Sequence, residues 1–152
     1  MAIDNDNVIS TLNGLIETCK DGQEGFRQAA EGVDNSELKT LFNTYSQQRA
    51  QFAAELQNEV RRLGGDPEKT SSTAGALHRG WINIKSAVTG RDESSIIAEC
   101  ERGEDSAVST YEDALKENLP ADIQTLLQRQ FGQVKEAHDR IRALERASGR
   151  GA

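Results

Sequence analysis

Six polar or ionisable residues fall on helical faces that are otherwise apolar. They are Gln23, Gln48, Arg49, Glu101, Glu104 and His138. Burying such groups costs free energy unless they pair with one another or hold a metal ion. Carboxylates and a histidine that face the interior of a helical bundle are the ligand types of di-iron sites. These residue types therefore allow two kinds of chemistry, a metal centre or a buried ion network.

The ligand pattern of a di-iron site is incomplete in this chain. Such a site takes one Glu from each of two helices and a Glu-x-x-His motif from each of the other two. Arg49 and Lys135 stand where the glutamates of these two motifs would be. Glu101, Glu104 and His138 could still form a mononuclear site for iron, manganese or zinc. That metal-binding protein or oxidoreductase is the alternative interpretation.

Arg49 favours the buried ion network. Its guanidinium is a permanent cation directed at the same space, so it would repel a divalent metal and attract the glutamates. We therefore expect an ion network in which Gln23 and Gln48 complete the hydrogen bonds, with no bound cofactor. The sequence also lacks a phosphate-binding glycine loop, a Ser/His/Asp set, a cysteine pair at zinc spacing and a dinucleotide fingerprint. We assign no catalytic residue, and the sequence favours a structural or interaction role over an enzyme.

Four long helices are needed to position these residues. Apolar residues recur at helical spacing over about 4–31, 36–63, 92–117 and 121–146. Turn residues separate these segments, and a cap from Asp34, Asn35 or Ser36 opens the second helix. A shorter helix is predicted over about 73–89, with Trp81 on its apolar face. Counted at about 1.5 Å per residue, the six polar residues fall in one cross-section of the bundle.

The lengths of the connections predict the topology. Short links join the first helix to the second and the third to the fourth, so each pair forms an antiparallel hairpin. The long middle link carries its own helix and crosses the bundle, so the second and third long helices run parallel. The fold class is therefore all-α, a ferritin-like four-helix bundle with a crossover helix. We expect a single domain over 1–147 and a disordered tail over 148–152.

Composition narrows the remaining expectations. The chain has 152 residues and a net charge of −7, and no Lys/Arg stripe suggests nucleic-acid binding. It has no apolar run of membrane-spanning length and no signal-peptide core, so we expect a cytoplasmic protein. Cys19 and Cys100 lie on apolar faces and are expected to be buried, reduced thiols. Trp81 is expected to clamp the crossover to the bundle, with His78 at its edge. A homo-oligomer such as a dimer is the expected assembly, and Trp81 at its contact is the alternative role for this side chain.

Three segments also resemble a known family. They are ECERGEDSAVSTYEDAL (99–115), HRGWINIK (78–85) and LQRQFGQVKEAHDRIRAL (127–144). Together they resemble a bacterial family of small ferritin-like four-helix proteins that is known only as a domain of unknown function. The resemblance implies the bundle described above and brings no activity. From the wider ferritin-like superfamily, only Glu101 or Glu104 and His138 stand where metal ligands would be expected. Analogy with related bacterial bundles suggests a role in stress response.

Overall fold

The regular structure of this chain is helical throughout the part that can be described. The computed structural model describes residues 4–67 and 81–150. The helices are α1 (Asn5–Gly32), α2 (Ser36–Arg62), α3 (Ile84–Gly90), α4 (Glu93–Leu115) and α5 (Ala121–Arg150). The all-α fold class and the four long helices are confirmed. None of the described helices is long and apolar enough to cross a membrane.

Local sequence signals fix where the helices begin and end. The side chain of Asn35 accepts hydrogen bonds from the backbone N–H groups of Glu37 and Leu38 and caps α2. At the other end of α2, Gly64 has a φ of +86° and Gly65 donates to the carbonyl of Val60 at 2.8 Å. This pattern is a Schellman motif, which needs a left-handed residue and so explains a glycine at this position.

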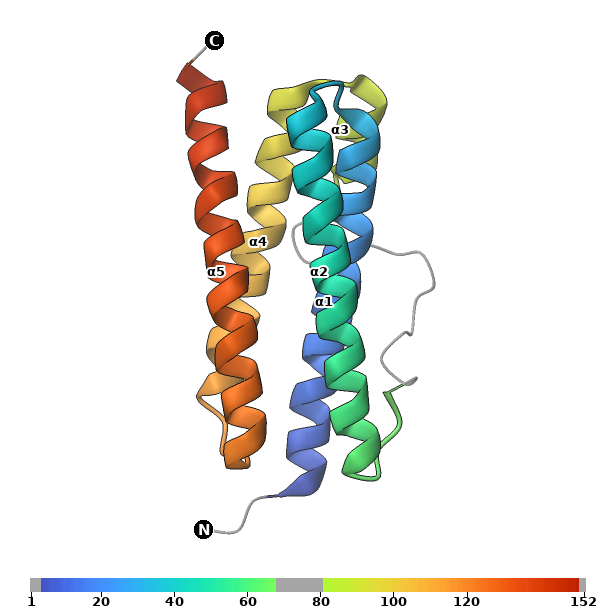
Figure 1. Ribbon diagram of the computed structural model, residues 1–152, viewed down its shortest axis with the longest axis vertical. Helices are drawn as coiled ribbons and strands as arrows, with labels where there is room; N and C mark the ends of the chain where they lie inside the picture. The colour runs from blue at the N-terminus through green and yellow to red at the C-terminus, as the bar shows by residue number, and fades with distance from the viewer. Residues whose placement is uncertain (1–3, 68–80, 151–152) are drawn as a thin grey trace.

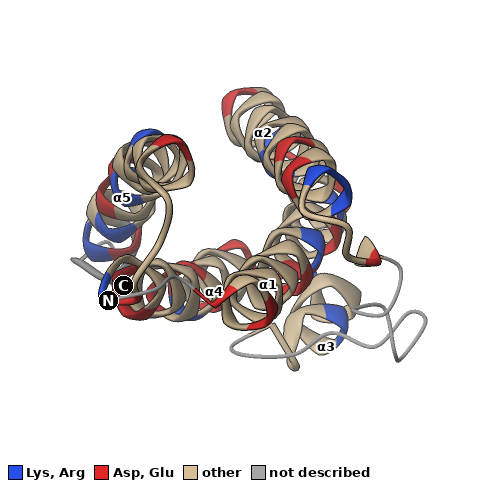
Figure 2. Cartoon of the chain, turned by 90° about the horizontal axis from the view of Figure 1, so that it is seen from below, with Lys and Arg blue, Asp and Glu red and all other residues tan. Residues whose placement is uncertain are grey.

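The chain has the ferritin-like connectivity that its link lengths predict. Figure 1 shows α1 and α2 as one antiparallel hairpin and α4 and α5 as another. α2 ends at the lower end of the bundle and α4 begins at the upper end, so these two helices run parallel. Viewed along the bundle, the long helices form an arc in the order α5, α4, α1, α2, and α3 packs outside against α1 and α4 (Figure 2). The arc leaves α2 and α5 with little direct contact.

The core consists of two apolar clusters. The lower cluster contains Cys19, Phe52, Ala107 and Val134 among its members. The upper cluster also draws side chains from all four long helices, and its members include Phe26, Phe42, Cys100 and Ile141. On every long helix the boundary between the clusters falls at the height where the sequence predicts the polar layer. Both cysteines are buried and free, as expected.

Trp81 anchors the crossover in a slot between α1 and α4. Its side chain is buried and contacts the Phe26 ring edge-on, with 5.0 Å between ring centroids. A Cβ atom added at Gly25 would lie 2.2 Å from the indole, and one added at Gly103 would lie 2.0 Å from it. The expected clamp is therefore confirmed, and the alternative of Trp81 at an exposed contact between copies is wrong.

Two helix boundaries differ from the prediction. The crossover was expected to be helical over about 73–89, but α3 begins only at Ile84, and Trp81 precedes it. The backbone N–H of Ile84 bonds instead to the carbonyl of Trp81 in a turn. Residues 73–80, including His78, lie outside the described residues. α5 continues to Arg150, past the expected end near Arg146 and into the segment assigned to a disordered tail, because residues 147–150 contain no proline to stop it.

Candidate functional site

A buried ion pair lies at the centre of the bundle. The Arg49 and Glu104 side chains are 1% and 0% exposed. Arg49 Nη1 donates to Glu104 Oε1 at 2.5 Å, and Nη2 donates to Oε2 at 2.7 Å. This two-pronged geometry matches the planar guanidinium to the carboxylate and uses both of its oxygens. The pair joins α2 to α4 between the two apolar clusters.

The surroundings of Arg49 accommodate its charge. Arg49 Nε donates to Gln48 Oε1 at 3.2 Å, and its guanidinium carbon lies 5.5 Å from the centre of the Phe26 ring. A Cβ atom at Gly22 would lie 3.3 Å from Arg49 Cγ and Nη1, so this glycine leaves room for the side chain. Burial alone would lower the pKa of Arg49, but the charge and hydrogen bonds of Glu104 raise it instead. The guanidinium therefore remains charged.

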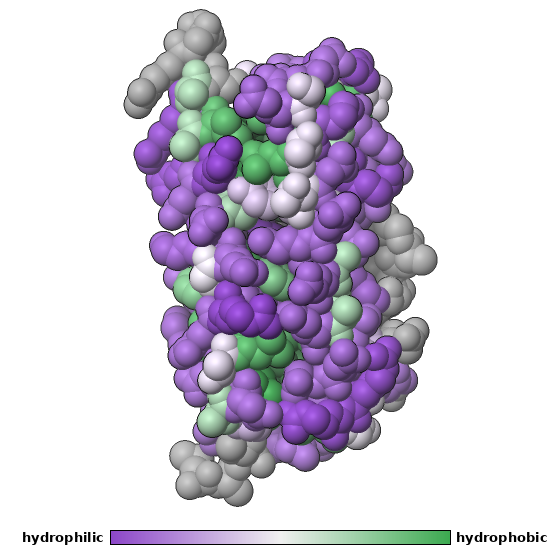
Figure 3. Space-filling view, viewed as in Figure 1, coloured by the Kyte–Doolittle hydropathy of each residue, from purple (hydrophilic) through white to green (hydrophobic). Residues whose placement is uncertain are grey.

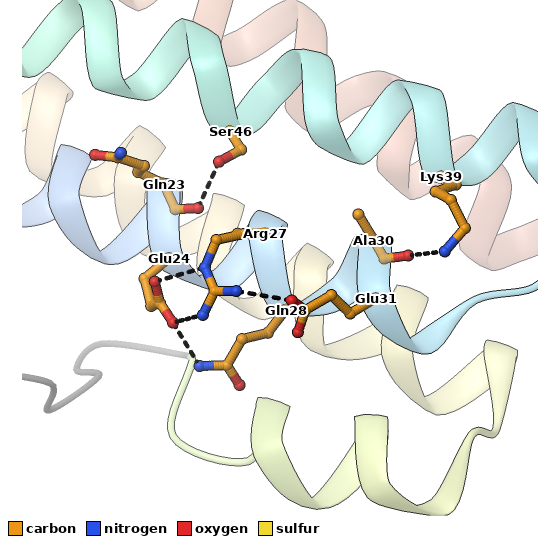
Figure 4. Close-up of polar contacts among 8 residues, drawn as sticks. All are labelled: Gln23, Glu24, Arg27, Gln28, Ala30, Glu31, Lys39 and Ser46. Atoms are coloured by element: carbon orange, nitrogen blue, oxygen red, sulfur yellow. Dashed lines mark hydrogen bonds and ion pairs between the residues drawn. The ribbon is translucent and has the colours of Figure 1, made fainter.

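Gln23 reaches the expected layer mainly through its backbone. Ser46 Oγ donates to the Gln23 carbonyl at 2.7 Å and ties α2 to α1, and the Gln23 amide points away from this bond (Figure 4). Lys39 makes a second tie of this kind to the carbonyl of Ala30 at 2.7 Å. These bonds hold the hairpin in the register that brings Arg49 into the centre.

His138 lies at the seam of α4 and α5 instead of beside the central pair. Its Nε2 lies 2.6 Å from Asp105 Oδ1, and its Nδ1 lies 3.1 Å from Asp139 Oδ1. Burial alone would lower the pKa of His138, but the bonds to Asp139 and Asp105 raise it above its ordinary value. Both ring nitrogens are therefore engaged by carboxylates.

Glu101 belongs to the same seam. Its side chain is 20% exposed and lies 3.8 Å from Arg142 Nε. Burial raises the pKa of Glu101, and the hydrogen bond and negative charge of Glu145 raise it further. The six predicted residues thus separate. Gln48, Arg49 and Glu104 meet at the centre, Gln23 contributes its backbone beside them, and Glu101 and His138 line one edge.

This arrangement does not fit the metal centre that the fold suggests. Arg49 takes both carboxylate oxygens of Glu104, and the two nitrogens of His138 face Asp105 and Asp139. Within residues 4–67 and 81–150, no three His, Cys, Asp or Glu side chains are grouped so that they could hold a metal ion. The Arg49 guanidinium occupies the carboxylate oxygens that a metal ion at the centre would need as ligands.

A second buried polar chain was missed by the sequence analysis. Tyr111 Oη donates to Gln130 Oε1 at 2.7 Å, and Gln130 Nε2 donates to Glu55 Oε1 at 2.9 Å. Cys19 Sγ lies 3.3 Å from Tyr111 Oη and extends this polar chain to α1. Burial raises the pKa of the Cys19 thiol to about 11, although the bond to Tyr111 lowers it. The spacing of Gln130, three residues after Leu127, was the signal for its inward position.

Glu99 is another buried carboxylate that the sequence analysis did not select. It is 1% exposed. Its Oε2 accepts from the backbone N–H of Asn83 at 2.7 Å, and its Oε1 accepts from Arg102 Nε at 2.8 Å. The first bond holds the turn that precedes α3, so Glu99 fixes the crossover next to the Trp81 slot.

Comparison with known proteins agrees with this architecture. A two-domain protein from Anabaena variabilis, with DJ-1/ThiJ/PfpI-like and ferritin-like domains, has a similar solved structure, with a TM-score of 0.80 and 16% sequence identity. The match covers 96% of this chain and 41% of that protein. No curated protein matches the sequence. The model of the family described as Domain of unknown function (DUF2383) matches residues 7–117, and the chain belongs to this family.

Proposed function

We propose that this protein is a ferritin-like bundle without a catalytic site, and that it acts through its structure and its association with other molecules. The observation that carries this proposal is the Arg49–Glu104 pair, which fills the centre of the bundle with a permanent cation. Removing two charges from water costs free energy, and the two short hydrogen bonds of the pair offset part of that cost. A metal entering this space would have to displace the guanidinium from Glu104.

The placement of the other candidate ligands supports the same proposal. His138 and Glu101 lie at the α4–α5 seam, each beside charged partners. Neither side chain is needed to complete the central pair. The buried pair would then serve to fix the register of α2 against α4, a role attested for buried polar groups in other helical proteins.

Metal analysis of the untagged protein tests this proposal. The full chain would be incubated separately with Fe²⁺, Mn²⁺ and Zn²⁺, passed through a desalting column and measured by elemental mass spectrometry beside Glu104→Ala and His138→Ala. We expect no stoichiometric metal in the wild-type protein.

One result would contradict the proposal. Near-stoichiometric metal in the wild type that is lost in both variants would mean that Glu104 and His138 are ligands. The protein would then be a metal-binding protein or an oxidoreductase, and Arg49 would have to move away from Glu104.

A further inference from the structure

The seam between α2 and α5 is open in its upper half. Arg129 bonds to Glu55 at 3.1 Å and Arg62 bonds to Asp122 at 2.7 Å, so polar contacts join the two helices near the lower end. Higher up, among the described side chains of residues 36–51 and 131–147, no hydrogen bond or ion pair crosses from α2 to α5. Polar contacts therefore join α2 and α5 only near their lower ends among these residues, and Figure 2 shows the two helices at the two ends of the arc.

This seam forms a groove of mixed polar and apolar surface. Two hollows lie along it. One of about 410 Å³ is lined by Leu41 among polar and charged side chains that include Glu37 and Arg140, and one of about 320 Å³ is lined by Phe52 among glutamines, Thr44 and Arg129. Figure 3, which views the molecule from this side, shows apolar surface in the upper part of the seam and again lower down.

The excess of negative charge on the long helices lies on α1 and α4, away from this groove. α4 carries seven acidic side chains and one basic side chain, and α1 carries five acidic and two basic side chains. α2 carries three acidic and four basic side chains, and α5 carries four and six. With a net charge of −7, two copies of the chain repel each other. The α2–α5 side is the one on which a second copy could approach without bringing the acidic helices together.

The groove also has charges that complement one another. Glu37 and Arg140 line the same 410 Å³ hollow. Neither forms an ion pair with another side chain in the described part of the protein. In a two-fold symmetric contact, each residue of one copy meets the equivalent surface of the other, so an acid and a base in the same patch become partners. A strongly acidic or basic ligand would instead favour a groove with one sign of charge.

We propose that the α2–α5 groove is the contact surface of a homodimer. A second copy would pack by the same face about a two-fold axis, cover the Leu41 side chain, and place each Arg140 against Glu37 of the other copy. This inference rests on the association role proposed above. It can fail alone, because finding a monomer would say nothing against the buried Arg49–Glu104 pair on which that proposal depends.

Solution mass of the untagged full chain tests the dimer. Sedimentation equilibrium over a series of concentrations should give twice the 16.6 kDa chain mass. Leu41→Glu should shift the protein to the monomer. Arg140→Glu and Glu37→Arg should each weaken association about tenfold or more. The double variant Glu37→Arg with Arg140→Glu should recover most of that loss, because it restores opposite charges across the axis.

Controls separate loss of the contact from loss of the fold. Lys116→Glu makes the same charge change as Arg140→Glu at the lower end of α4 and should leave the dimer intact. Far-UV circular dichroism should be unchanged in every variant. A monomer at all concentrations would overturn the inference, and so would a dimer that is insensitive to Leu41→Glu or a charge-reversed pair without recovery.

Discussion

Removing one member of the Arg49–Glu104 pair should destabilise the protein far more than removing both. In Arg49→Met, the Glu104 carboxylate stays in a fully buried position without its two charge-assisted hydrogen bonds. An unpaired buried charge of this kind costs about 3–5 kcal/mol. Glu104→Leu leaves the Arg49 guanidinium with Gln48 as its remaining hydrogen-bond partner and should cost a similar amount. A loss of this size is a large fraction of the total stability of a domain.

The double variant should recover most of this loss. In Arg49→Met with Glu104→Leu, no charge remains to be buried, and the new side chains extend the apolar clusters on either side. Replacing a buried ion pair by well-packed apolar residues is often neutral or stabilising by about 1–4 kcal/mol. The two substitutions should therefore be strongly non-additive, as expected for residues in direct contact.

Urea unfolding followed by far-UV circular dichroism measures this cycle. If the slope of the free energy of unfolding against urea concentration is the same in every variant, a shift in the unfolding midpoint measures the change in stability. For a chain of this length, a loss of about 3–5 kcal/mol should lower Tm by roughly 6–20 °C. Arg27→Met is the matched control, since Arg27 pairs with Glu31 on the surface and is 49% exposed. It should cost less than about 1 kcal/mol.

Two outcomes would refute the reasoning. If Arg49→Met costs less than about 1 kcal/mol, Glu104 is not left as an uncompensated buried charge. If the double variant loses as much as the two single variants together, the interaction between the side chains does not account for the cost. Either result would also remove the assigned role of the pair in fixing helix register.

Four further predictions concern other parts of the structure. Gly103→Ala should cost about 1–3 kcal/mol and shift the tryptophan fluorescence, because its Cβ would lie 2.0 Å from the indole. Gly14→Ala, which meets nothing within 4 Å, should instead stabilise α1 by roughly 0.5–1 kcal/mol in the same urea titration. Because burial raises the pKa of the Cys19 thiol from 9.0 to about 11, the folded state holds this proton more tightly than the unfolded chain. Its contribution to stability is complete below pH 9 and is lost as the pH rises toward 11, so urea midpoints should fall less steeply in Cys19→Ser over that range. For His138, whose pKa is raised in spite of its burial, Asp105→Asn should lower the pKa in an NMR titration, and an unchanged value would mean that the 2.6 Å contact does not set it.

The helices and their connectivity could be predicted because their signals are local. The cap at Asn35, the Gly64–Gly65 stop and the short links between hairpin partners act within a few residues of the chain. They need no knowledge of the rest of the fold. α3 was misjudged because its beginning depends on distant residues, the Glu99 carboxylate and the slot that holds Trp81.

The candidate site could be predicted only in part, because helical periodicity locates a face less finely than a site requires. Glu104 lies four residues after Cys100 and three before Ala107, at the middle of the buried stripe, and reaches the centre. Glu101 lies at the margin of that stripe, where a small rotation of the helix decides between the interior and the α4–α5 seam. His138 also lies at the margin of its buried stripe. The sequence therefore predicted one polar layer, whereas the structure separates the central Arg49–Glu104 pair from Glu101 and His138 at the α4–α5 seam.

The central pair and the tryptophan slot act on the same stretch of the bundle. Glu104 follows Gly103 directly in α4, so the residue that pairs with Arg49 adjoins the glycine that admits Trp81. On α1, Gly22 makes room for the guanidinium and Gly25, one turn later, makes room for the indole. A shift of α4 by one turn would therefore break the ion pair and close the slot together. The two contacts therefore require the same register of α1, α2 and α4, which is the role proposed above for the buried pair.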